Sequence, residues 1–126
     1  MKFQPDTFAG TNAISRHEQG AVWVNNQRFE GSLVVPWKGE VRAWSARDHA
    51  TLTAEHFSEV LMLKPELVIF GSGLRLRFVS AGLYRCLIDA RIGLETMDSA
   101  AACRTYNVLA AEGRSVVAAL LPALAD

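Results

Sequence analysis

The chain has 126 residues, with 13 basic and 13 acidic side chains, and half of its residues are hydrophobic. This high apolar content and zero net charge exclude an intrinsically disordered protein. The balanced charge also argues against a dedicated nucleic-acid binder, which would be strongly basic. A chain of this length has room for one ordinary domain, so we expect a single domain over residues 1–126 with its core at about 14–122.

No segment predicts secretion, membrane insertion or a metal site. Residues 1–20 lack the apolar stretch of a signal peptide, and the longest apolar run, Val116–Leu121, is far shorter than the ~20 residues that span a bilayer. Cys86 and Cys103 do not form a Cys-x-x-Cys pair, and two thiols cannot complete a zinc site alone. We therefore expect a cytoplasmic protein with free thiols and with no bound metal or cofactor.

The first half of the sequence has the pattern of short antiparallel strands. Turn signals such as Asn25-Asn26 separate apolar or alternating runs. Pro36 indicates the end or the edge of a strand, because proline lacks the N–H that a central strand donates. The runs lie at residues 13–17, 21–24, 28–31, 32–35 and 40–44.

The second half alternates helices with continuous apolar runs, which are typical of strands buried on both faces. Helices are expected from Thr53 to about Met62, from Ser80 to just before Gly93, and from Asp98 to Gly113, with Thr53, Ser80 and Asp98 as N-caps. The strands between and after them are expected at 67–70, 92–97 and 116–121. Such alternation predicts parallel pairing with right-handed crossovers, and hence an α/β fold.

The carboxyl ends of these strands are where an open α/β sheet usually binds its ligands. The segments Gly71-Ser72-Gly73, Thr96-Met97-Asp98 and Leu121-Pro122 are expected to meet there. The Gly-Ser-Gly turn presents backbone N–H groups to an anion, or serves only as a tight turn with positive φ angles. It does not complete the dinucleotide motif Gly-x-Gly-x-x-Gly, because Leu76 stands at the third glycine.

Catalysis by a serine triad and metal binding by histidines find little support. Ser72 is outside a Gly-x-Ser-x-Gly motif, and nothing in the spacing places a histidine between it and Asp98. His49 and His56 are two helical turns apart, but the predicted helix begins between them, so they do not share a metal ion.

Several stretches together resemble a known family. They are Val24–Gly31, Pro36-Trp37, Val68–Gly73, Gly93–Ala101, Thr105–Leu109 and Glu112–Arg114. From about Ile14 to Pro122 the chain resembles the family of mitochondrial respiratory complex I assembly factor 3 and its bacterial and archaeal relatives, which have a Mth938-like domain. The resemblance implies a single three-layer α/β domain whose mixed sheet has a parallel β-α-β-α-β C-terminal half and antiparallel N-terminal strands. For the mitochondrial members it implies complex I assembly through protein contacts rather than catalysis.

Two hypotheses for the function follow. The first is a non-enzymatic assembly factor or adaptor, which presents the rim of the strand ends and an arginine group to a protein partner. The second is a small-molecule-binding protein or enzyme that uses the Gly71-Ser72-Gly73 turn and Asp98. The candidate binding and interaction residues are Trp37, Gly71, Ser72, Gly73, Arg75, Thr96, Asp98, Tyr106 and Asn107. The arginine group comprises Arg75, Arg77, Arg85, Arg91 and Arg104.

Structural roles are also open for several of these residues. Trp37 can close the core, Tyr106 fits a buried helical stripe, and Asn107 can bond to backbone. Asp98 has a sufficient role as a helix cap. The sequence leaves open the identity of the partner and the oligomeric state.

Overall fold

The computed structural model describes residues 10–124, and the expectations for residues 1–9 and 125–126 lie outside the described part. The strands are β1 (Ile14–Glu18), β2 (Ala21–Val24), β3 (Gln27–Glu30), β4 (Leu33–Pro36), β5 (Arg42–Ala43), β6 (Leu67–Gly71), β7 (Gly93–Met97) and β8 (Val116–Leu120). The helices are α1 (Ala54–Leu61), α2 (Arg85–Asp89) and α3 (Ser99–Ala111), with 3-10 turns η2 (His49–Thr51) and η3 (Ala81–Tyr84). No helix among these residues has the length and hydropathy needed to cross a bilayer.

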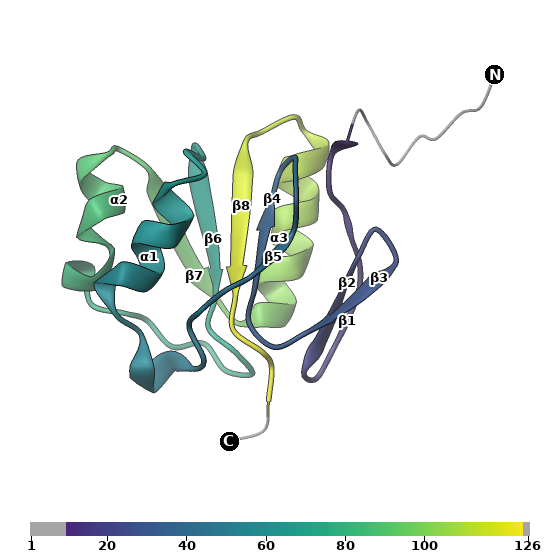
Figure 1. Cartoon of the computed structure of the whole chain (residues 1–126), viewed down its shortest axis with the longest axis horizontal. Coiled ribbons are helices and arrows are strands. Elements are labelled where there is room, and N and C mark those ends of the chain that lie inside the picture. Colours follow the sequence, from purple (N-terminus) through teal and green to yellow (C-terminus); the bar gives the residue numbers. More distant parts are fainter. Residues whose placement is uncertain (1–9, 125–126) are drawn as a thin grey trace.

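The main sheet has five strands in the order β5-β4-β8-β6-β7 (Figure 1). β6 pairs in parallel with both β7 and β8, whereas β4 pairs antiparallel with β5 and β8. The predicted α/β fold with a parallel C-terminal half is therefore confirmed. The carboxyl ends of β6, β7 and β8 all lie at one edge, the lower one in Figure 1.

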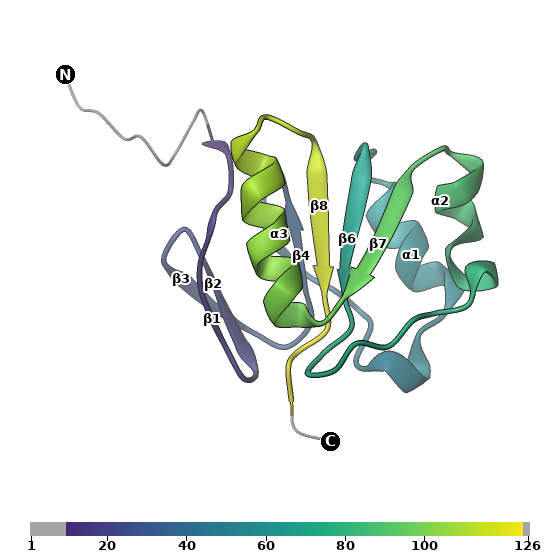
Figure 2. The ribbon, with the colours of Figure 1, turned by 180° about the vertical axis from the view of Figure 1, so that it is seen from behind.

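Helices cover the two faces of this sheet. α1 and α2 lie over one face and α3 over the other, which gives three layers (Figure 2). The antiparallel strands β1, β2 and β3 form a second, three-stranded sheet beside α3. Its β2–β3 hairpin turns at Asn25-Asn26, whose φ angles of 52° and 70° give the left-handed conformation that asparagine tolerates.

Each face of the main sheet has its own apolar cluster. On the α1 and α2 face, the rings of Trp44, Phe57 and Phe70 meet edge to face at centroid distances of 5.7–6.1 Å. On the other face, α3 packs Ala102 and Tyr106 against β6, β8 and the second sheet. β6 and β8 are buried along their whole length, in keeping with their continuous apolar sequences.

Two expected elements are shorter than the sequence suggests. The alternating run at 40–44 forms only the two-residue strand β5, because Trp44 leaves the strand to enter the aromatic cluster, where its Nε1–H donates to the carbonyl of His56. The predicted helix from Ser80 begins as the 3-10 turn η3 and becomes the five-residue α2. Ser80 makes no side-chain cap bond, and Gly82 weakens the helix at its start.

Candidate functional site

The three expected strand ends do meet, and two serines join them. The Ser72 N–H donates to the carbonyl of Met97 at 2.8 Å, which ties the end of β6 to the end of β7. The Ser99 hydroxyl donates to the carbonyl of Leu121 at 2.6 Å and accepts from the Gly73 N–H at 2.9 Å. Ser99 thus links the first turn of α3 to the segments that follow β6 and β8.

The Ser72 hydroxyl organises the loop that follows β6. Ser72 is 4% exposed, and its hydroxyl lies 2.6 Å from the carbonyl oxygen of Arg75, to which it donates. It also accepts from the Arg77 N–H at 3.0 Å and lies 3.2 Å from the carbonyl of Met97. Within residues 10–124 the partners of this hydroxyl are all backbone groups, so it staples the loop and has no base beside it as a serine nucleophile would.

The two glycines of the turn meet different physical demands. Gly73 has a φ of +105°, a conformation that residues with a Cβ rarely adopt. Gly71 has an ordinary φ, but a Cβ there would lie 2.8 Å from Ser99 Oγ and 2.9 Å from a methyl carbon of Leu120. β6 therefore ends in glycine because α3 and β8 approach its backbone closely.

Asp98 and Thr96 lie at the end of β7. The Asp98 carboxylate accepts from the Ala101 N–H at 2.9 Å and caps α3, as its position before the helix predicts. Thr96 is half-buried in β7, where it pairs with Phe70. Neither residue lines the hollow beside the Gly-Ser-Gly turn.

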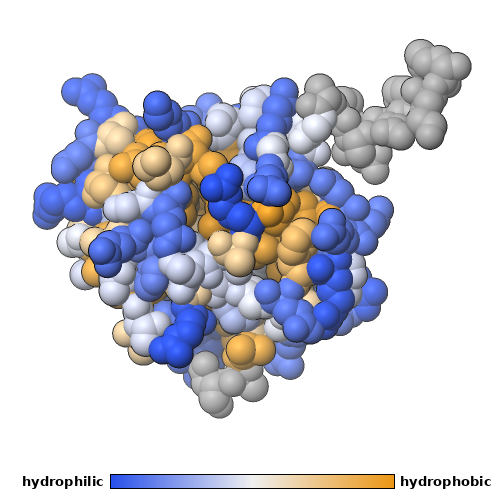
Figure 3. All heavy atoms as spheres, in the orientation of Figure 1, coloured by the Kyte–Doolittle hydropathy of each residue, from blue (hydrophilic) through white to orange (hydrophobic). Residues whose placement is uncertain are grey.

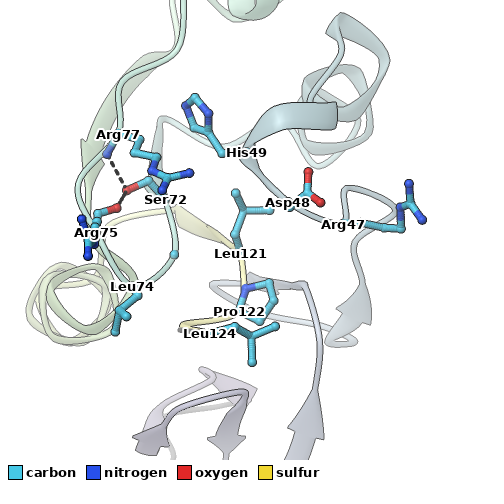
Figure 4. Close-up of a pocket in the computed structure, with 11 residues that line it drawn as sticks. Arg47, Asp48, His49, Ser72, Leu74, Arg75, Arg77, Leu121, Pro122 and Leu124 are labelled. Carbon is cyan, nitrogen blue, oxygen red and sulfur yellow. Dashed lines mark hydrogen bonds between the residues drawn. The ribbon is translucent and has the colours of Figure 1, made fainter. Parts of the chain in front are cut away.

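This hollow lies at the strand-end edge and has a volume of about 230 Å³ (Figure 4). Its walls come from the segment after β6, the segment before η2 and the segment after β8. The residues that line it are Arg47, Asp48, His49, Ser72, Gly73, Leu74, Arg75, Arg77, Leu121, Pro122 and Leu124. Sequence reasoning placed Ser72, Gly73 and Arg75 at this edge but missed the contribution of residues 47–49, because no local pattern brings a loop from the first half to these strand ends.

Basic groups outnumber acidic ones around the hollow. In Figure 4 the Arg77 side chain points into it beside Ser72, whereas Arg47 and Arg75 point away from its centre on opposite sides. Asp48 is the one carboxylate among the residues that line it. Hydrogen bonds from the Thr51 hydroxyl and then the Thr51 N–H hold the pKa of Asp48 below its ordinary value.

His49 supports the loop from the other side of the hollow. Its Nε2 lies 2.8 Å from the carbonyl oxygen of Phe78. A carbonyl oxygen can only accept a hydrogen bond, so this contact places a proton on Nε2 of His49. His49 therefore positions the loop, and its own hydrogen bond is not directed to Ser72.

Tyr106 and Asn107 lie on α3 and connect it to the N-terminal strands. The fully buried Tyr106 hydroxyl lies 2.9 Å from the carbonyl of Asn12 and 3.1 Å from that of Pro36. Burial raises the pKa of Tyr106 well above its ordinary value, so this hydroxyl stays a donor. The Asn107 side chain accepts from the N–H of Ile14 at 2.8 Å and donates to its carbonyl at 2.7 Å. These contacts of Tyr106 and Asn107, the α3 clamp, tie the helix to β1, to the segment before it and to the end of β4.

Trp37 lies near the other end of α3. Its Nε1–H donates to the carbonyl of Ala110 at 3.2 Å, and the Lys38 ammonium lies 4.6 Å from the ring centroid. Trp37 is half-buried against the core, which fits core closure. The candidate residues thus divide between two sites. Gly71, Ser72, Gly73, Arg75, Thr96 and Asp98 lie at the strand-end edge, and Trp37, Tyr106 and Asn107 lie around α3.

The buried Cys103 thiol is not activated as a nucleophile. Cys103 is buried, and burial raises the pKa of its thiol to about 12, which keeps it protonated. Cys86 is half-buried in α2, and both cysteines are free. Among residues 10–124, no group of three His, Cys, Asp or Glu side chains is arranged to hold a metal ion.

The fold matches those of solved bacterial proteins, one of which is described as a Mth938-like domain. A crystal structure of a Bordetella parapertussis protein superposes with a TM-score of 0.86 at 35% identity, over 91% of this chain and 98% of that one. A Bordetella pertussis solution structure described as a Mth938-like domain gives a TM-score of 0.79 at 29% identity, over 98% of this chain and 94% of that one. The class of protein is therefore a Mth938-like α/β domain.

The sequence comparison gives the family. Residues 14–121 match the family described as "Protein of unknown function (DUF498/DUF598)", and the chain belongs to it. The chain is 30% identical over 121 residues to "NADH dehydrogenase [ubiquinone] 1 alpha subcomplex assembly factor 3" of Danio rerio, a match that covers 94% of this chain and 68% of that protein. It spans 58 to 60% of the length of the mammalian proteins with the same name. The family resemblance predicted from the sequence is confirmed.

Proposed function

We propose that the protein is an assembly factor for a respiratory NADH dehydrogenase and that it acts by binding protein partners in the cytoplasm. The observation that carries this proposal is the similarity to NADH dehydrogenase assembly factors over 94% of the chain. Because the similarity includes nearly the whole described fold, the proposal concerns this domain and not a short shared motif.

The chemistry of the strand-end edge supports a role without catalysis. Ser72, Asp98, Asp48 and His49 are all engaged in the fold: Ser72 and His49 bond to loop backbone, Asp98 caps α3, and Asp48 caps η2. A catalytic serine needs a base within hydrogen-bond reach, whereas the Ser72 hydroxyl bonds to the backbone of Arg75, Arg77 and Met97. What this edge offers to other molecules is exposed surface.

Deleting the gene in its host tests the proposal. We expect the deletion to lower the amount of assembled NADH dehydrogenase on native gels, with succinate dehydrogenase as the unaffected control, and a plasmid copy to restore it. Antibodies to individual subunits would show whether the unassembled subunits accumulate. Unchanged NADH dehydrogenase in the deletion strain would refute the assembly role.

A second candidate is the binding of a small anionic metabolite at the Gly71-Ser72-Gly73 turn. The observation that favours it is the arginine-lined hollow beside Gly73. Its volume of about 230 Å³ is below the roughly 300–1,000 Å³ of typical ligand pockets. A thermal-shift screen of anionic metabolites tests this candidate: a shift that Arg77→Ala abolishes would support it, and no shift with any compound would refute it.

A further inference from the structure

Within residues 10–124 the second sheet ends in a strand that pairs on one side only. The strand order is β1-β2-β3, and β1 is the strand that lies against α3, so β3 is at the outer edge. In Figure 3 the right-hand side of the molecule, where Figure 1 places β3, is mainly hydrophilic. An edge strand carries backbone N–H and C=O groups that can pair with a strand of another chain.

The β2–β3 hairpin fixes which backbone groups of β3 point outward. Its two-residue turn has positive φ at both positions, and the residues that flank such a turn form a hydrogen-bonded pair. Further along the hairpin the Gly31 N–H donates to the carbonyl of Gly20. Because backbone groups alternate sides along a strand, those of Phe29 also point toward β2. Those of Arg28 and Glu30 therefore point to the free edge.

The outer face of β3 carries one charge of each sign. Arg28 and Glu30 lie two residues apart on this face, where their side chains are 52% and 68% exposed and form an ion pair at 2.6 Å. Arg28 also lies 5.6 Å from the ring centroid of Trp23, which is opposite it on β2. Phe29 faces the other way and is half-buried against the core. The two charged residues are thus the same two whose backbone groups face the free edge.

Charge and backbone geometry agree on a second copy of β3 as the partner. If two copies run antiparallel with their Phe29 residues opposite each other, Arg28 of each copy lies opposite Glu30 of the other. Both residues have outward backbone groups, as a hydrogen-bonded antiparallel pair requires. Their side chains then form a square of alternating charge, in which each keeps its own ion pair and gains a second one.

Neighbouring registers of the same strand pair do not satisfy both conditions. A slip of one residue places outward backbone groups opposite groups that are already bonded to β2. A slip of two residues restores the backbone match but places Arg28 opposite Arg28, or Glu30 opposite Glu30, and like charges directly opposite each other are destabilising.

We propose that the chain forms a two-fold symmetric homodimer in which the β3 strands pair in the register that opposes Arg28 and Glu30. The pairing joins the two three-stranded sheets into one continuous sheet. The contact is short and mainly polar, so the dimer is weak and exchanges with the monomer. This inference goes beyond the proposed assembly role and does not depend on it.

Analytical ultracentrifugation of the purified chain tests the dimer. We expect the sedimentation coefficient to rise with protein concentration, because monomer and dimer exchange. Arg28→Glu places acidic residues opposite each other in the dimer and should weaken dimerisation at least about tenfold. A monomer at every concentration up to about 1 mM, or a dimer that Arg28→Glu leaves unchanged, would overturn the proposal.

Arg16 offers a matched control on the same face of the sheet. It forms an ion pair with Glu18 and lies 4.5 Å from the ring centroid of Trp23, much as Arg28 does, but it is on β1 at the opposite side of the sheet. Arg16→Glu should therefore leave dimerisation unchanged. Equal losses from Arg16→Glu and Arg28→Glu would mean that the dimer uses the face of the sheet, and the proposed pairing of β3 would be wrong.

Complementary variants test the register itself. Arg28→Glu leaves two acidic residues at the edge and Glu30→Arg leaves two basic ones, so each variant alone should be monomeric, whereas an equimolar mixture should form a heterodimer. The double exchange Arg28→Glu with Glu30→Arg should restore the homodimer, because opposite charges again face each other. Circular dichroism confirms that each variant is folded. If folded variants dimerise neither in the mixture nor after the double exchange, the proposed register is refuted.

Amide exchange followed by NMR distinguishes this interface from an edge that is already covered in the monomer. The N–H groups of Arg28 and Glu30 should exchange more slowly in a concentrated sample than in a dilute one. The Phe29 N–H, which is directed to β2, should exchange slowly in both. Slow exchange at Arg28 and Glu30 at every concentration would mean that another part of the same chain pairs with β3, and the dimer proposal would fail.

Discussion

The α3 clamp and residues 74–78, the strand-end loop, use their side chains in opposite ways. In the clamp, the polar groups of Tyr106 and Asn107 form hydrogen bonds with the backbone of Asn12 and Ile14. In the loop, Leu76 and Phe78 leave their apolar groups in water, while the buried Ser72 supports them from below. Among residues 10–124 no buried side-chain nitrogen or oxygen lacks a hydrogen-bond partner.

This contrast shows that a family motif can serve the fold rather than a binding site. The run Thr105–Leu109 is one of the stretches that carry the family resemblance, and two of its residues make internal contacts. Large apolar side chains are exposed instead in the loop after Gly73, at Leu74, Leu76 and Phe78. Four predictions sharpen this comparison between the two regions.

The largest effect is expected in the clamp. Tyr106→Ala removes a fully buried ring and should lower the free energy of unfolding by about 3–5 kcal/mol. Tyr106→Phe removes only the hydroxyl that bonds to Asn12 and should cost about 1 kcal/mol. Urea unfolding followed by circular dichroism measures both. A loss below about 1 kcal/mol for the alanine variant would mean that the clamp is not part of the cooperative fold.

The next largest loss of stability is expected at Gly71, where α3 and β8 pack closely against the end of β6. Gly71→Ala places a Cβ within 3 Å of Ser99 and Leu120 and should cost about 1–3 kcal/mol, because the buried neighbours must move. Gly82→Ala is the matched control: its φ is not positive and no atom lies within 4 Å of the added Cβ. We expect that variant to be neutral or slightly stabilised in the same unfolding experiment. Equal losses for the two variants would contradict the packing argument.

A smaller effect is expected for the cap of α3. Asp98→Ala removes the acceptor for the Ala101 N–H and should cost about 1 kcal/mol, whereas Asp98→Asn keeps an acceptor and should cost a few tenths. Thermal unfolding compares the two variants. If Asp98 instead holds a ligand, Asp98→Asn would abolish ligand-induced stabilisation while leaving the free protein intact.

The smallest effect on stability is expected in the strand-end loop. Leu76→Ser with Phe78→Ser changes only exposed side chains and should alter the free energy of unfolding by less than about 0.5 kcal/mol. The same double variant should fail to restore NADH dehydrogenase in the deletion strain. A large loss of stability would show that these side chains belong to the core, and full rescue would show that the loop does not serve assembly.

Local sequence patterns predicted most of the fold. The apolar runs at 67–70 and 116–121 became the buried strands β6 and β8, because such runs satisfy a sheet covered on both faces. Asp98 and Gly113 correctly marked the limits of α3, since N-caps and left-handed terminal glycines depend on a few neighbouring residues.

Contacts between distant parts of the chain could not be predicted in this way. Asn107 bonds to Ile14 across 93 positions of sequence, and neither residue carries a local signal of the other. The same holds for His49, which reaches Phe78 across 29 positions and helps to form the hollow. The three converging strand ends could be predicted because topology places them together, but the loop that completes the site could not.

The place of β8 in the main sheet has a consequence for biosynthesis. β8 is the last strand along the described chain, yet it lies between β4 and β6 and is the strand that joins them. While the ribosome is still making residues 116–120, the hairpin of β4 and β5 and the unit of β6 and β7 have no shared strand to complete the sheet. We therefore expect nascent chains that stall before Val116 to stay open to proteases and chaperones, and the native sheet to close only after translation of β8.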